Sequence, residues 1–174
     1  MSKRVTYCER WNGTLHKPIG VMSMDEARQR NDAGELYSVA LGDPTHPDAF
    51  IEINWTLNYL GVWFFDEKCR RVLKYVFERV NDDQMFMTEL GTWEYPPEAG
   101  SGLNEASFIE TVLYSQDGTV RHREKDKRAS EVRTKDIRDV PVDINWETVP
   151  EFGQWDSVAR HDREPPAVTE HDTS

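Results

Sequence analysis

Two glutamates stand in strand-like runs, where a side chain could be shielded from water and act as an acid or a base. Glu52 lies between two isoleucines, and Glu110 lies in a β-rich run near the middle of the chain. Burial of a carboxylate raises its pKa, which suits a general base. Trp55 and Trp63 are the residues that we expect to line a pocket around such a base. This enzyme hypothesis describes a lipocalin-like small barrel of cyclase or isomerase type that acts on an apolar small molecule.

Other catalytic and metal-binding signatures are missing from the sequence. The chain has five histidines, at positions 16, 46, 122, 161 and 171, and none has the short spacing to another histidine or to a cysteine that is typical of a metal site. The sequence has no GxSxG, P-loop, GxGxxG or HExxH motif. We therefore expect no metal and no cofactor.

A second group of residues fits a protein interface. The segment Trp93-Glu94-Tyr95-Pro96-Pro97-Glu98 places two aromatic residues beside two acids at the end of an expected strand. Aromatic anchors surrounded by carboxylates suit an interface with a basic partner. The expected contact residues are Asp66, Glu67, Asp82, Asp83, Trp93, Glu94, Tyr95 and Glu98. This binding hypothesis is the preferred one, and it describes an immunity-like or inhibitor-like protein without catalytic activity.

The charge of the chain limits its partners. The 32 acidic residues outnumber the 21 basic ones, which gives a net charge of −11 and a pI near 4.9. Such a chain repels nucleic acid and anionic membranes, whereas it attracts basic proteins. The sequence contains no run of about 18 apolar residues, which is the length needed to span a membrane. The first ten residues lack the apolar core of a signal peptide, and Cys8 and Cys69 show no metal spacing, so we expect a cytoplasmic protein with reduced thiols.

The sequence predicts one short helix over residues 24–33. Ser23 and Glu26 form a predicted capping box, in which the Ser23 hydroxyl accepts from the amide of Glu26 and the Glu26 carboxylate accepts from the amide of Ser23. Met22 is placed to pack on Ala27 as a hydrophobic staple, and Gly34 provides a left-handed stop.

Most of the remaining pattern indicates β-strands. Apolar residues alternate with polar ones over 51–57, and the following run 60–65 is apolar on both faces, so the two segments suggest a hairpin. Further strands are expected over 72–80 and 85–95. The runs 108–114 and 119–123 flank Asp117-Gly118, which favours a tight hairpin turn. The charged stretch 121–135 suggests a solvated edge or loop, and the alternative is a small basic patch on an otherwise acidic protein. We therefore expect an α+β domain, mainly antiparallel β, folded as a small barrel or a strongly curved sheet with one or two short helices.

The chain length fits a single domain, with residues 1–160 globular and 161–174 a disordered polar tail. The segment 22–93 resembles the Imm1-type immunity proteins of bacterial polymorphic toxin systems. The shared features are a short acidic helix that begins at Ser23-Met24-Asp25-Glu26-Ala27, the alternating strand Phe50-Ile51-Glu52-Ile53, and the aromatic strand Gly61-Val62-Trp63-Phe64-Phe65-Asp66-Glu67. The resemblance implies a toxin-neutralising role, and it transfers no site residue to this chain.

Overall fold

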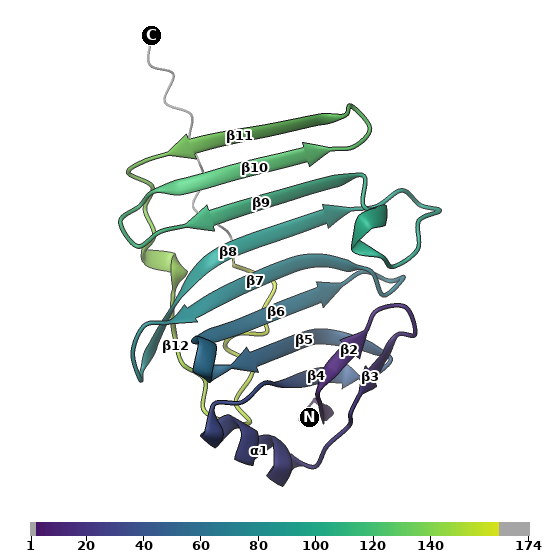
Figure 1. The fold of residues 1–174 in the computed structure, drawn as a ribbon, viewed down its shortest axis with the longest axis vertical. Coiled ribbons are helices and arrows are strands. Elements are labelled where there is room, and N and C mark those ends of the chain that lie inside the picture. Colours follow the sequence, from purple (N-terminus) through teal and green to yellow (C-terminus); the bar gives the residue numbers. More distant parts are fainter. Residues whose placement is uncertain (1–2, 164–174) are drawn as a thin grey trace.

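The computed structural model describes residues 3–163, which form one large antiparallel sheet with an α-helix at its lower end (Figure 1). Nine of its ten strands follow one another in the order β1-β4-β5-β6-β7-β8-β9-β10-β11. Their bounds are β1 Val5–Cys8, β4 Tyr37–Asp43, β5 His46–Asn54, β6 Tyr59–Phe65, β7 Arg71–Arg79, β8 Gln84–Glu94, β9 Phe108–Tyr114, β10 Val120–Asp126 and β11 Glu131–Ile137. The expected α+β class with mainly antiparallel strands is confirmed.

Within residues 3–163 this sheet is open. Its two edge strands are β1 and β11, and they do not pair with each other. A barrel requires the first and last strands to meet with a fixed stagger. Here the successive hairpins extend the sheet in one direction instead of returning to its start (Figure 1). The expectation of a small barrel or a strongly curved sheet is therefore not confirmed.

The predicted helix is present, and one of the two hydrogen bonds of the predicted capping box forms, whereas the Glu26 carboxylate pairs with Arg30 at 3.4 Å. Helix α1 spans Met24–Ala33, and the Ser23 hydroxyl accepts a 3.1 Å hydrogen bond from the amide of Glu26. Gly34 ends the helix in the left-handed conformation, at φ 74°. Met22 and Ala27 are both buried in the main core, as the staple predicts. None of the helices within residues 3–163 has the length and apolar character needed to cross a membrane.

The expected strand over 51–57 ends earlier than its alternation predicts. Strand β5 stops at Asn54, and a 3-10 helix, η1 (Trp55–Leu57), follows. The Asn54 side chain caps this turn by accepting from the amide of Leu57. Trp55 consequently leaves the sheet, and its indole N–H donates to the Asn31 side chain at 2.9 Å.

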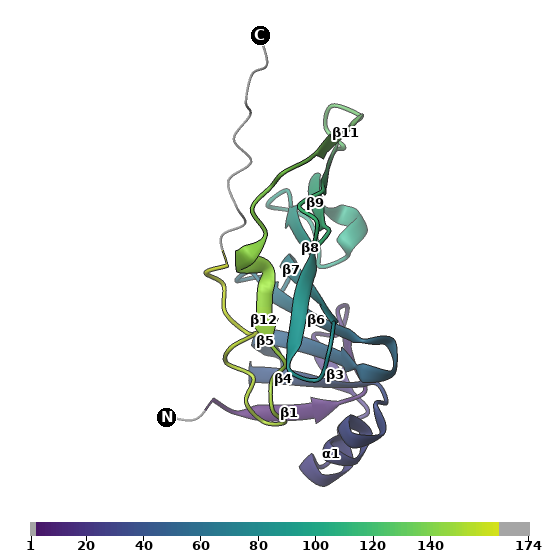
Figure 2. The same cartoon turned by 90° about the vertical axis from the view of Figure 1, so that its left-hand side faces the viewer.

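The part of the chain after β11, residues 138–163, forms a C-terminal segment that covers one face of the sheet (Figure 2). We call this face the segment face. This segment contains the 3-10 helix η3 (Asp143–Asn145) and the short strand β12 (Trp146–Thr148), which pairs with the first residues of β8. The main core lies between the segment and the sheet. The residues that the segment contributes to it are Val140, Val142, Trp146, Val149, Phe152, Trp155, Val158 and Ala159.

The packed part of the segment continues beyond residue 160. The His161 ring lies 4.1 Å from that of Phe64, and the Arg163 side chain is buried. The rest of the expected tail, 164–174, lies outside the described residues.

The opposite face carries a small two-stranded hairpin, so we call it the hairpin face. Strands β2 (Arg10–Asn12) and β3 (Lys17–Ile19) pair with each other. They help to cover a second apolar cluster of Cys8, Trp11, Ala40, Phe50, Trp63 and Cys69. Both cysteines are free thiols.

The far end of the sheet is exposed. Strand β11 forms the edge there and is exposed at every position before Ile137. Its alternating charges discourage the addition of another strand. The expected charged edge therefore corresponds to β11, whereas residues 121–126 lie in β10, which pairs with strands on both sides.

Candidate functional site

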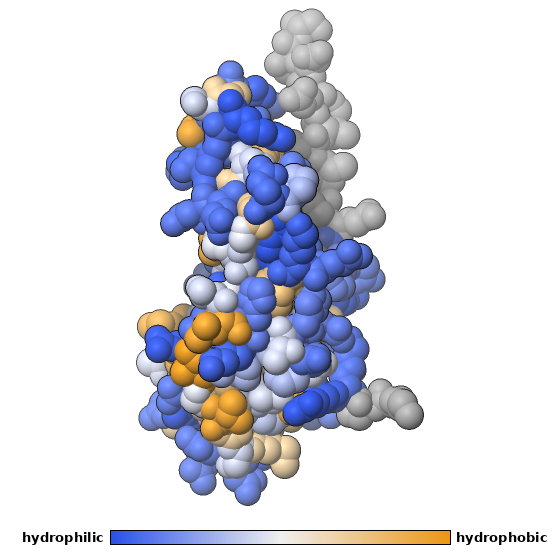
Figure 3. Space-filling model, turned by 90° about the vertical axis from the view of Figure 1, so that its right-hand side faces the viewer, coloured by the Kyte–Doolittle hydropathy of each residue, from blue (hydrophilic) through white to orange (hydrophobic). Residues whose placement is uncertain are grey.

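One end of the sheet brings together most of the residues expected to contact a partner. The β6–β7 turn carries Glu67, and the end of β8 with the loop after it carries Trp93, Glu94, Tyr95 and Glu98. We call these five residues the acidic end surface. Figure 3 faces this end of the molecule, where hydrophilic residues dominate and several apolar patches occur in the lower half.

Two cations hold the turn and the loop together. The Lys68 ammonium donates to the Pro97 carbonyl, and the Arg70 guanidinium donates to the Pro96 carbonyl at 2.9 Å. Arg70 also forms a 2.7 Å ion pair with Asp66. The charge of Arg70 is balanced by Asp66, whereas the Lys68 ammonium contacts a neutral carbonyl and offsets one of the neighbouring negative charges.

The exposed carboxylates of the surface are not committed to other side chains. Within residues 3–163, Glu67, Glu94 and Glu98 are exposed and make no ion pair with another described residue. These three exposed carboxylates outnumber the Lys68 ammonium, so this end of the sheet carries a negative field that attracts a cationic group.

Asp66 has a structural role instead. Its carboxylate accepts from the amides of Lys68 and Arg70, at 3.0 and 2.9 Å, and from the Arg70 guanidinium. Burial raises the pKa of Asp66, but the hydrogen bonds from Arg70 and Lys68 outweigh burial and hold the pKa below its ordinary value. Asp66 thus shapes the turn that presents Glu67.

Trp93 is held in place by the residues beneath it. Its ring lies 5.3 Å from that of Trp63 and covers Gly91, where a β-carbon would approach the ring to 2.6 Å. Trp63 is itself fixed, because its indole N–H donates to Glu52 at 3.2 Å and the Arg71 guanidinium lies 4.5 Å above its ring. A half-buried aromatic residue that is already fixed loses little conformational entropy when a partner binds it.

Tyr95 is fixed in a similar way. Its hydroxyl donates to the Arg71 carbonyl at 2.9 Å, and the Arg70 guanidinium lies 4.9 Å from its ring centre. Burial raises the pKa of Tyr95 to about 12, so the hydroxyl keeps its proton and remains a donor near neutral pH. Both aromatic residues are therefore held in fixed orientations.

Asp82 and Asp83 do not belong to this surface. They lie in the β7–β8 turn, at the opposite end of β8, and Asp82 forms an exposed ion pair with Arg79. Strand β8 has 11 residues, and at about 3.3 Å per residue its two ends are on the order of 30 Å apart. The eight expected contact residues therefore do not form one patch, because the length of β8 separates Asp82 and Asp83 from the others.

The structure also separates the residues of the enzyme hypothesis. Glu52 lies on the hairpin face, whereas Glu110 lies on the segment face. They are four strand steps apart, which is about 19 Å at about 4.8 Å per step. Trp55 packs beside the helix, and Trp63 lies on the hairpin face. Glu52 and Glu110 therefore cannot act on one substrate as a pair, and the two tryptophans do not line one pocket.

The structure brings together one group of side chains that could hold a metal ion, although the sequence led us to expect no metal site. Glu110, His122 and Glu124 converge on the segment face, with their ligand atoms within 4.8 Å of one another. The available signal was the spacing of two residues between His122 and Glu124, which places both side chains on one face of a strand. The contribution of Glu110 depends on the β9–β10 pairing.

Comparison of the chain with protein-family models, curated proteins and solved structures finds no match.

Proposed function

We propose that this protein is a non-enzymatic binding protein of immunity or inhibitor type, which engages a basic protein partner through the acidic end surface. The observation that carries this proposal is the combination of three uncommitted carboxylates with two fixed aromatic residues. Each component has a separate role in binding.

The aromatic residues supply the anchor. Trp and Tyr dominate the energetic hot spots of protein interfaces, where they are surrounded by contacts that exclude water. Trp93 retains exposed area although Trp63 and Gly91 fix its orientation. Because the ring is already positioned, most of the gain from burying its remaining surface contributes to affinity.

The carboxylates supply attraction and specificity. Exposed charges act over a Debye length of about 8 Å at physiological ionic strength. Glu67 and Glu98 lie on the turn and the loop that Lys68 and Arg70 hold together, and Glu94 ends the strand that leads into that loop, so all three charges lie at one end of the sheet. We therefore expect them mainly to raise the association rate, and their effect to fall as salt is added.

Two further observations agree with the proposal. The segment 22–93 resembles Imm1-type immunity proteins, whose role is to neutralise toxins. The free thiols of Cys8 and Cys69 suit a reducing compartment, so we propose a cytoplasmic location.

The experiment that tests the proposal is affinity capture with matched variants. The immobilised protein is exposed to an extract of the cells that express it, and the captured proteins are identified by mass spectrometry. The test variants are Trp93→Ala and the triple change Glu67→Gln, Glu94→Gln and Glu98→Gln.

The control is a triple variant at the other end of the sheet, with Glu78→Gln, Asp82→Asn and Asp83→Asn. Both triple variants lose three negative charges, so they have the same net charge. The proposal predicts that a basic protein is captured by the wild type and by the control, and is lost with both test variants. Absence of such a protein from the wild-type capture, or equal capture by all variants, would contradict the proposal.

A further inference from the structure

A cluster of one histidine and two glutamates lies on the segment face of β9 and β10, away from the acidic end surface. The register pairs Glu110 directly with Glu124, and His122 precedes Glu124 by two residues on the same face. The His122 Nε2 atom lies 3.0 Å from Glu110 Oε2 and 3.9 Å from Glu124 Oε1. All three ligand atoms lie within 4.8 Å of one another.

These separations fit a tetrahedral metal ion. Zinc binds His nitrogen and carboxylate oxygen at about 2.0–2.2 Å, so two ligand atoms of a tetrahedral zinc are about 3.3–3.5 Å apart. The two measured distances from His122 Nε2 bracket this value. We propose that Glu110, His122 and Glu124 form a binding site for a divalent cation of the zinc type.

The charges around the cluster favour a cation between the carboxylates. Like charges directly opposite each other on paired strands are unfavourable, and Glu110 faces Glu124 in this way. The neighbouring cations come from the edge strand β11. Arg133 is 4.0 Å from Glu124 but lies closer to Glu131, at 2.6 Å, and Lys135 is the register partner of His122. A divalent ion would offset the repulsion between the two glutamates.

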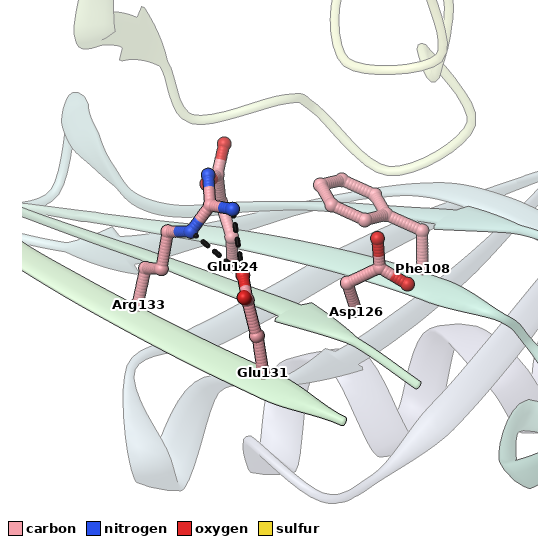
Figure 4. Close-up of a pocket in the computed structure, with 5 residues that line it drawn as sticks. All are labelled: Phe108, Glu124, Asp126, Glu131 and Arg133. Atoms are coloured by element: carbon pink, nitrogen blue, oxygen red, sulfur yellow. Dashed lines mark hydrogen bonds and ion pairs between the residues drawn. The ribbon is translucent and has the colours of Figure 1, made fainter. Parts of the chain in front are cut away.

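A shallow hollow adjoins the cluster and adds negative charge. Phe108, Glu124, Asp126, Glu131 and Arg133 line it (Figure 4). Figure 4 shows Phe108, Asp126 and Arg133 projecting from the same face of the sheet. The Arg133 guanidinium donates a hydrogen bond to the Glu131 carboxylate. Three of the five lining residues are carboxylates, so the approach to the cluster is acidic and attracts cations.

The strands hold the three ligands in a fixed arrangement. Strand β9 pairs on both sides, with β8 and β10, and its Val112 and Tyr114 side chains are buried beside the cluster. Sites built on paired strands are more precise than sites on loops. The side chains of Glu110, His122 and Glu124 remain 26–31% exposed, so an ion can enter and retain a coordination position for water.

The ligand set determines which ions the site prefers. One imidazole nitrogen with two carboxylate oxygens suits zinc and related borderline metals such as cobalt and nickel. Calcium and magnesium prefer six or more oxygen ligands, including water. The proposed site therefore discriminates against these two ions.

A zinc titration of the full chain tests the proposal. Imidazole signals in ¹H–¹⁵N NMR spectra identify the histidine that binds, and competition with a chromogenic chelator gives the affinity. The site variants are His122→Gln and Glu110→Gln. The matched control is His46→Gln, because His46 is an exposed histidine on another strand. Circular dichroism checks that each variant is folded.

The expected result is one tight zinc ion per chain that shifts the His122 signals. Both site variants should weaken zinc binding at least tenfold, whereas the His46→Gln variant should bind as the wild type does. Magnesium at the same concentration should leave the His122 signals unchanged. The proposal is overturned if zinc leaves the His122 signals unchanged, or if the His122→Gln variant keeps the wild-type affinity. Glu110, His122 and Glu124 are not among the five residues of the acidic end surface, so a failure of zinc binding leaves the proposed partner binding standing.

Discussion

Replacing Arg163 by leucine tests how the C-terminal segment is attached to the sheet. Arg163 has a nearly buried side chain, whose guanidinium donates to the Glu147 carboxylate and, at 2.6 Å, to the Ser157 carbonyl. It also lies 5.0 Å from the ring centre of Phe77, a fully buried core residue. One side chain thus joins β12, the end of the segment and the sheet.

The magnitude follows from burial. Removing one partner of a buried ion pair costs about 3–5 kcal/mol, because the other charge is left uncompensated. Glu147 retains 15% side-chain exposure, and Arg160 is 3.8 Å away, so the lower end of the range applies. Leucine also keeps apolar contact with Phe77. We therefore expect the free energy of unfolding to fall by about 2–3 kcal/mol.

Urea unfolding followed by tryptophan fluorescence measures this loss, with the double variant Glu147→Leu/Arg163→Leu as the comparison. Replacing a buried ion pair by apolar residues is often close to neutral, so the double variant should be more stable than Arg163→Leu alone. A loss below about 1 kcal/mol for Arg163→Leu, or additive losses in the double variant, would refute the reasoning.

Three other perturbations test separate parts of the structure. Changing Gly118 to alanine should cost about 1–3 kcal/mol in thermal unfolding, because its φ is 84° and a β-carbon would lie 2.9 Å from the Val140 carbonyl; an unchanged Tm would contradict this. Burial raises the pKa of the Cys8 thiol to about 12, so a thiol reagent should modify Cys8 only when the protein unfolds, and rapid labelling of the native state would count against that burial. Burial raises the pKa of Asp66, but hydrogen bonds from Arg70 outweigh it, and the net lowering stabilises the fold above about pH 4, the ordinary aspartate pKa. This stabilisation is lost as pH falls through the lower folded-state pKa, so Asp66→Asn should be less stable than wild type at neutral pH and should approach it in acid. Parallel pH profiles of the two proteins would show that Asp66 makes no such contribution.

Local signals were sufficient to predict the helix and several hairpins. Ser23, Glu26 and Gly34 define helix α1 through contacts within a few residues, so no distant information is needed. The hairpin around Gly118 is equally local, although only Gly118 of the Asp117-Gly118 pair has a positive φ. The Asp117 side chain instead accepts from the amide of Thr119.

Short strands with distant partners were not predictable in the same way. Strands β1 and β12 pair with residues thirty or more positions away, and their few residues carry little periodic signal. The same limit explains why the segment was expected to end at residue 160. A polar sequence gives no sign that Arg163 will meet a buried glutamate.

The faces of the sheet depend on details that alternation does not contain. Register shifts occur between Leu41 and Gly42, between Phe64 and Phe65, and between Val76 and Phe77. One extra residue moves every following side chain of that strand to the other face. Glu52 and Glu110 could therefore be assigned to strands from the sequence, but their relative faces could not.

The acidic end surface was predictable in part. Trp93, Glu94, Tyr95 and Glu98 are near one another in the chain, so their proximity is assured. Glu67 joins them only because β6 and β8 end on the same side of the sheet.

The measurement that tests the central claim most directly is an NMR titration of the protein with an oligo-arginine peptide. The amide chemical shifts report which residues meet a cationic ligand. Binding through the acidic end surface predicts that the largest changes fall on the amides of Glu67, Trp93, Glu94, Tyr95 and Glu98, and that Trp93→Ala reduces them. Changes spread evenly over the acidic residues, or centred on Asp82 and Asp83, would contradict the claim that this end of the sheet is the binding surface.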